Sequence, residues 1–189
     1  MKTSGKATSN IGRDQAPAFI QDAAHTIERS QLRTLFEDGL RDLYQVEKSL
    51  LTVLPRMAAN ASSEKLIQAI GRHLEETREH VYKLEQIFGI TGKKARVKKS
   101  PGMDGIIKEN HEIMKTTDAG IMRDAAIIAS AQAIEHYEIS SYGTLRTYAE
   151  MLGLDHISVK IQDILDEEKR ADETLTDIAY TINREAAGR

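Results

Sequence analysis

Apolar side chains recur at helical spacing through most of the chain, in four long segments with short breaks between them. The pattern predicts helices over about 30–60, 64–88, 119–151 and 156–184, and a shorter amphipathic helix over about 105–115. Residues 1–28 lack this pattern, and we expect a flexible tail there, apart from a short helical turn near 19–26. We therefore predict an all-α protein in which residues 29–186 form an antiparallel four-helix bundle.

The segment 89–118 is a long crossover between the second and third long helices, and it carries the short extra helix. It begins with a basic run, residues 93–99, which could contact an anion or nucleic acid. The run has no interleaved aromatic residue, and the chain as a whole has a net charge of -3. We therefore favour a solvated loop, and nucleic acid is not the expected partner.

Composition narrows the class of protein further. The chain has no cysteine, which excludes disulfides, iron–sulfur clusters and thiolate metal sites, so any metal would be held by His, Asp and Glu. No apolar run approaches the roughly 20 residues of a membrane span. The first residues are polar and do not form the apolar segment of a secretory signal, so we expect a cytoplasmic protein.

Acids and imidazoles interrupt the apolar stripes of all four long helices. These inward residues are Glu47, Glu76, His80, Glu135, Glu138, Glu168 and Asp172. His73 is an alternative to His80 on the second helix, and Tyr142 follows Glu138 by one turn. Glu167, by contrast, should point to solvent. A buried carboxylate is costly unless it is paired, protonated or bound to a cation.

Each of these residues alone also has a structural explanation, such as a glutamate that packs its stem and reaches water with its head. A satisfied acid–histidine network is therefore one interpretation. We favour a metal site because Glu47, Glu135 and Glu168 are central on three separate helices. The matching positions hold no Lys or Arg, although Arg146 could reach in. Oxygen-rich ligands without sulfur suit iron or manganese, with magnesium and calcium as further candidates.

Three motifs carry a resemblance to a known family. They are EETREHVYKLE at 75–85, QAIEHYEISSYGTL at 132–145 and LDEEKRAD at 165–172. Over about residues 32–179 the chain resembles the YciE/YciF family of bacterial ferritin-like proteins. The resemblance implies a ferritin-like (rubrerythrin-like) four-helix bundle, commonly a homodimer, that is associated with stress responses and has no firmly established reaction.

The resemblance also implies a set of ligands. Glu47, Glu135, Glu138 and Glu168 match ligand positions of the ferritin-like pattern. Its usual Glu-x-x-His pairs are absent from the second and fourth long helices. Glu76-x-x-x-His80 and Glu168-x-x-x-Asp172 stand in their place.

The leading hypothesis is a ferritin-like stress protein with two iron or manganese ions per chain that acts on peroxide, dioxygen or the metal itself. In it, Tyr142 would hydrogen-bond a ligand or supply an electron. A second hypothesis is a non-enzymatic structural or interaction protein with a degenerate metal site. A third is a storage or DNA-protecting shell, for which the basic loop is the only indication. Whether the protein is an enzyme stays open at this stage.

Overall fold

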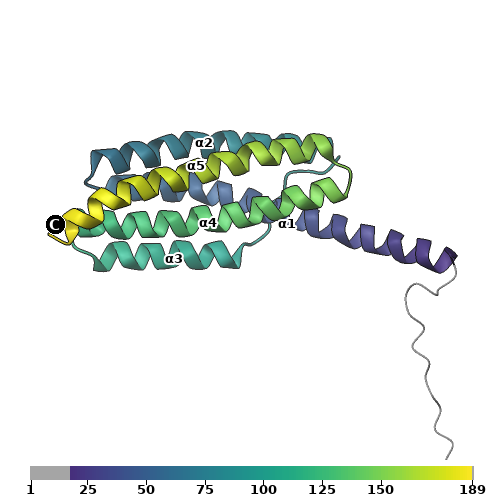
Figure 1. Cartoon of the computed structure of the whole chain (residues 1–189), viewed down its shortest axis with the longest axis horizontal. Helices are drawn as coiled ribbons and strands as arrows, with labels where there is room; N and C mark the ends of the chain where they lie inside the picture. The colour runs from purple at the N-terminus through teal and green to yellow at the C-terminus, as the bar shows by residue number, and fades with distance from the viewer. Residues whose placement is uncertain (1–17, 189) are drawn as a thin grey trace, which may run out of the picture.

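The structure is a computed structural model that describes residues 18–188, and it is helical apart from short connections. Its helices are α1 (Ala18–Asn60), α2 (Glu64–Ile90), α3 (Pro101–Thr116), α4 (Ile121–Met151) and α5 (Asp155–Ala186) (Figure 1). No β-strand occurs in this range, so the predicted all-α class is confirmed. None of the described helices is long and apolar enough to cross a lipid bilayer.

The four long helices lie side by side, and each runs opposite to the two long helices that it packs against (Figure 1). Helices α2 and α4 run in the same direction, because α3 runs back between them along the chain. Helices α1 and α5 each pack against both α2 and α4, so the four surround a common interior. The shorter α3 lies on the outside, along α4. It begins at Pro101, earlier than the predicted residue 105, because the proline ring favours the first position of a helix.

The apolar core consists of two clusters, one toward each end of the long helices. The first contains Phe36, Leu40, Leu84 and Leu145, and the second contains Leu54, Leu66, Ile127 and Leu175, among others. The buried acids and imidazoles Glu47 of α1, His73 and His80 of α2, Glu135 and Glu138 of α4 and Glu168 of α5 lie where the two clusters meet. The polar side chains are therefore held in a layer that apolar side chains cover from both ends.

The first helix starts well before the predicted Ser30. No Gly or Pro interrupts the chain between Pro17 and Gly39, so the helix extends back to Ala18. The first turns of α1 project beyond the other helices (Figure 1). The Arg29 guanidinium anchors this end by donating to the carbonyl oxygen of Leu152 at 3.1 Å. The remainder of the predicted tail, residues 1–17, lies outside the described residues.

The turn between α1 and α2 is fixed to α4 by one buried carboxylate. Asp124 accepts hydrogen bonds from the Ser62 and Ser63 amides at 2.7 and 2.9 Å, and from the Ser62 hydroxyl at 2.6 Å. The Ser63 hydroxyl in turn accepts from the Leu66 amide, as expected of an N-cap. These bonds satisfy backbone donors that a helix start leaves without partners.

The connection between α2 and α3 is fixed to α1 by polar contacts. The Tyr137 hydroxyl donates to Asp42 at 2.9 Å and lies 2.9 Å from the Ser100 hydroxyl. Within the basic run, Lys93 pairs with Glu37 and Lys98 pairs with Asp38. Part of the positive charge of this run is therefore matched by acids of α1.

The turn between α4 and α5 depends on a glycine. Gly153 adopts a positive φ of 71°, which suits glycine at a helix end. Asp155 is the first residue of α5, and Leu154 occupies the cap position before it without a side-chain hydrogen bond.

Candidate metal centre

Six side chains from all four long helices meet in the polar layer. They are Glu47 of α1, His73 and His80 of α2, Glu135 and Glu138 of α4, and Glu168 of α5. All six are buried, and Glu47, His80, Glu138 and Glu168 have no exposed surface at all. The structure thus brings together five of the seven residues predicted as ligands, together with His73.

Glu168 lies between the two imidazoles and faces each with a different oxygen. Its Oε1 is 3.0 Å from Nδ1 of His80, and its Oε2 is 3.8 Å from Nε2 of His73. The other acids extend the cluster on either side. Nδ1 of His80 is 3.4 Å from Glu47 Oε1, and Nε2 of His73 is 3.3 Å from Glu135 Oε1.

The ligand atoms fall into two groups in which all atoms lie within 4.8 Å of one another. One group is His73, Glu135, Glu138 and Glu168, and the other is Glu47, His80 and Glu168. Glu168 belongs to both groups. A carboxylate with one oxygen toward each of two positions is the arrangement by which acids bridge neighbouring metal ions in helical carboxylate sites.

Many of these atoms have no hydrogen-bond partner in the protein. They include both oxygens of Glu138 and Glu168, one oxygen each of Glu47 and Glu135, both ring nitrogens of His73 and Nδ1 of His80. Buried polar atoms without partners cost about 1–3 kcal/mol each, and more when charged. The set is rich in oxygen, contains two imidazoles and lacks sulfur, so it fits iron or manganese.

Burial and mutual repulsion favour the protonated forms of Glu135 and Glu138, the two acids that α4 contributes to the cluster. Burial raises the pKa of Glu135 and of Glu138 well above the ordinary value of 4.5, and the neighbouring carboxylates raise both further. Burial also raises the pKa of Glu47, although the neighbouring His80 opposes this. Glu168 is the exception: burial raises its pKa, but His80 and His73 outweigh burial and leave it lowered.

The imidazoles are shifted toward their charged forms. Burial lowers the pKa of His73, but Glu135 and other acids outweigh this and raise it to about 9. For His80, burial again lowers the pKa, while Glu168 and Glu47 raise it to about 11. Protons on both rings can thus balance part of the acidic charge, and a metal ion would compete with them.

Tyr142 contacts the cluster from α4. Its hydroxyl donates to Oε1 of Glu47, and the centre of its ring lies 6.5 Å from the centre of the His80 ring. Burial, together with the charges of Glu47 and Glu138, raises the pKa of Tyr142 well above its ordinary value. The phenol therefore stays protonated and acts as a hydrogen-bond donor to Glu47.

The expectation that Glu167 points to solvent is wrong. Its Oε2 lies 2.8 Å from Nε2 of His80 and accepts a hydrogen bond from Lys83 Nζ at 2.7 Å. Burial raises the pKa of Glu167, but Lys83 and His80 outweigh burial and leave it lowered. Sequence reasoning missed this residue. Its adjacency to Glu168 and the presence of Lys83 three residues after His80 were the available signals.

Glu76 and Asp172 lie outside the cluster. Glu76 turns about 60° away from His73 around α2, and its partly exposed carboxylate is 3.7 Å from His73 Nδ1. Asp172 accepts a hydrogen bond from Gln132 at 3.2 Å and lies 3.3 Å from the His136 ring. Arg146 does not reach in either, because it pairs with Glu150 on the outside of α4.

The fold and the site together define an all-helical protein with a buried glutamate–histidine cluster. The chain belongs to the family described as "domain of unknown function (DUF892)", whose model matches residues 31–187. It is 41% identical over 157 residues to Protein YciF of Escherichia coli K12, across 82% of this chain and 95% of that protein. The resemblance to the YciE/YciF family is thereby confirmed.

Two solved structures are similar as well. The crystal structure of the E. coli stress protein YciF matches with a TM-score of 0.78 at 40% identity, covering 81% of this chain and 97% of that one. YcfI of Rhodopseudomonas palustris, described as a candidate structural protein, matches with a TM-score of 0.74 at 40% identity, covering 77% and 92%.

Proposed function

We propose that this protein is a ferritin-like four-helix-bundle protein that binds two iron or manganese ions in the buried cluster. The observation that carries the proposal is the pair of ligand groups that share Glu168. Most of the ligand atoms in these groups have no hydrogen-bond partner in the protein, although they come from four different helices. A cation at each position would satisfy these atoms and offset the repulsion between acids.

Two such ions would supply the electrons needed to reduce dioxygen or hydrogen peroxide. The residues of the chain hold and shield them. Tyr142 fixes Glu47, and Glu167 fixes His80, so both side chains are oriented before an ion arrives. The two apolar clusters cover the layer from its two ends. The name of the E. coli relative, a stress protein, supports a role in handling peroxide or metal under stress. A cytoplasmic homodimer is part of this proposal.

The test is metal loading of the full chain followed by metal analysis. We expect two equivalents of Fe(II) or Mn(II) per chain and metal-dependent consumption of hydrogen peroxide. Glu168→Gln should lose both, because it alters the ligand that the two groups share. Glu173→Gln, an exposed neighbour on the same helix, is the matched control and should behave as wild type. A folded wild-type protein that takes up no metal would refute the proposal.

A second candidate is a structural protein without metal chemistry. It is favoured by the protons that the cluster holds: the raised pKa values of His73 and His80 reduce the net charge without any ion. The description of the R. palustris relative points the same way. On this alternative, Glu168→Gln changes neither metal content nor peroxide consumption, because the wild type has neither.

A further inference from the structure

A cavity of about 220 Å³ lies directly beside the cluster. Residues of α1, α2, α4 and α5 line it, and its inner end is formed by His73 and Glu135, which are themselves buried. Both ring nitrogens of His73 and one oxygen of Glu135 lack hydrogen-bond partners there. The cavity therefore reaches from the surface to unsatisfied polar atoms of the candidate metal centre.

The wall of the cavity is apolar. It is formed by Leu54, Ala69, Ile70, Ala131, Ala171 and Leu175. Half of these are alanines, whose short side chains leave the space open. A cavity of about 150 Å³ accepts a benzene-sized molecule, whereas a water molecule occupies only about 30 Å³. The cavity is thus larger than dioxygen or peroxide requires and matches a small organic molecule.

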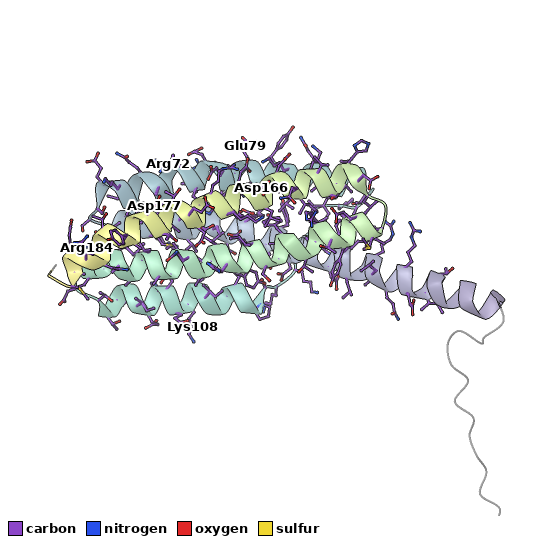
Figure 2. The ribbon with its side chains drawn as sticks, in the orientation of Figure 1. Arg72, Glu79, Lys108, Asp166, Asp177 and Arg184 are labelled. Carbon is purple, nitrogen blue, oxygen red and sulfur yellow. The ribbon has the colours of Figure 1, made fainter. Side chains whose placement is uncertain are left out.

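Two arginines line the same cavity from its exposed side. Arg72 projects from α2 (Figure 2), and Arg170 belongs to α5, which packs against α2. Within residues 18–188 neither guanidinium has an ion-pair partner. The carboxylate of Glu76 also lines the cavity, but it faces the ring of His73 at 3.7 Å.

Two guanidinium groups without partners suit a carboxylate, which they can bind through paired N–H donors. The apolar wall suits a hydrocarbon chain, whose burial there removes its methylene groups from water. Along the cavity, the two arginines therefore lie at the mouth, the apolar side chains in the middle and the candidate metal ligands at the inner end.

We propose that this cavity binds a short-chain aliphatic carboxylate, with the carboxylate on Arg72 and Arg170 and the chain directed toward His73. That the chain would end next to a metal ion rests on the proposed function. Binding itself depends only on the cavity and the two arginines.

The test is calorimetric titration of hexanoate into the full-length protein, as purified and after loading with Mn(II). We expect one hexanoate per chain with a Kd below about 1 mM. Hexylammonium, 1-hexanol, acetate and phosphate should each bind at least about tenfold more weakly, because each lacks the chain or the carboxylate. Equal binding of 1-hexanol would show an apolar cavity alone, and equal binding of phosphate a general anion site. Either result would overturn the proposal.

Two variants test the two halves of the site. Arg72→Gln combined with Arg170→Gln should weaken hexanoate binding at least about tenfold, since it removes both charged donors. The control, Arg78→Gln combined with Arg184→Gln, changes two exposed arginines that do not line the cavity and should bind as wild type. Ala171→Leu should fill the cavity and weaken binding of hexanoate. Undiminished binding in the Arg72/Arg170 variant would refute the proposal even if Ala171→Leu fails to fold.

Metal analysis of the same samples keeps the two proposals apart. We expect the arginine variants to hold as much metal as the wild type. A protein that binds metal but not hexanoate would refute the carboxylate site alone. One that binds hexanoate but no metal would refute the metal centre and leave the carboxylate site standing.

Discussion

Nε2 of His80 lies 2.8 Å from Oε2 of Glu167, and the same oxygen accepts a hydrogen bond from Lys83. A carboxylate that is ionised can only accept, so Nε2 of His80 carries the hydrogen. This leaves Nδ1, which faces Glu47 and Glu168, as the nitrogen available to a metal ion. A carboxylate of α5 thus fixes the orientation of a histidine of α2, and it keeps the hydrogen on Nε2 when Nδ1 gives up its proton to a metal ion.

Removing the Glu167 carboxylate should weaken metal binding without removing a ligand. In Glu167→Ala the His80 ring loses its acceptor, and we expect metal affinity to fall by about 10–100-fold. Competition with a chelator of known affinity measures the change. Glu167→Gln keeps an acceptor oxygen and should lose less. The exposed Glu173→Ala serves as control, and equal affinities for Glu167→Ala and wild type would show that the contact does not orient the ligand.

The Tyr142 hydroxyl offers a second test of how the ligands are positioned. Tyr142→Phe removes the donor to Glu47 and leaves that buried carboxylate with one partner fewer. We expect a loss of stability of about 1–2 kcal/mol in the metal-free protein. The metal position of Glu47 and His80 should weaken more than that of His73, Glu135 and Glu138. Stepwise titration with Mn(II) distinguishes the two positions, and an equal loss at both would contradict the assignment.

Asp124 allows a stability test away from the cluster. Asp124→Ala leaves two backbone amides and one hydroxyl of the α1–α2 turn without their acceptor. We expect the free energy of unfolding to fall by about 3 kcal/mol, measured by urea denaturation. Metal stoichiometry should not change. Asp118→Ala, which alters an exposed acid just before α4, is the control. A loss below about 1 kcal/mol would show that other groups or water replace the carboxylate.

Helical periodicity alone predicted that the central acids point inward, because the rotation of about 100° per residue fixes which residues share a face of the helix. Glu47, Glu135, Glu138 and Glu168 all lie inside for this reason. The same step gave the wrong result for Glu167. It lies about 100° from Glu168 and would face water on an isolated helix, but α2 packs beside it and supplies His80 and Lys83.

The choice between His73 and His80 shows the same limit. Both point inward, because His73, Thr77 and His80 follow one another at helical spacing on the buried face of α2. Glu76 and Asp172 stay outside the cluster. Glu76 lies only about 60° around α2 from the buried His73, and Asp172 lies only about 40° around α5 from the buried Glu168. An angle of this size decides between core and rim only once the facing helix is known.

Metal binding should strengthen as pH rises. The pKa of His80 is about 11 in the folded protein against an ordinary 6.5, and that of His73 is about 9. Each raised histidine pKa contributes its full stabilisation of the folded protein below pH 6.5, the ordinary histidine pKa. This stabilisation is lost as the pH rises through the pKa that the histidine has in the folded protein. The raised pKa values of Glu135 and Glu138 act in the same direction, starting from their ordinary 4.5.

These protons occupy the atoms that a metal ion needs, so a metal ion must displace them. We expect Mn(II) affinity to rise roughly tenfold per pH unit for each proton released, between about pH 5.5 and 8. The increase in Tm that Mn(II) causes should grow over the same range, because the metal-free protein loses the stabilisation from its protonated ligands while the loaded protein does not. Thermal unfolding with and without Mn(II) across this range measures it. An increase in Tm that is the same at every pH would mean that Mn(II) binds elsewhere, at groups that do not titrate here.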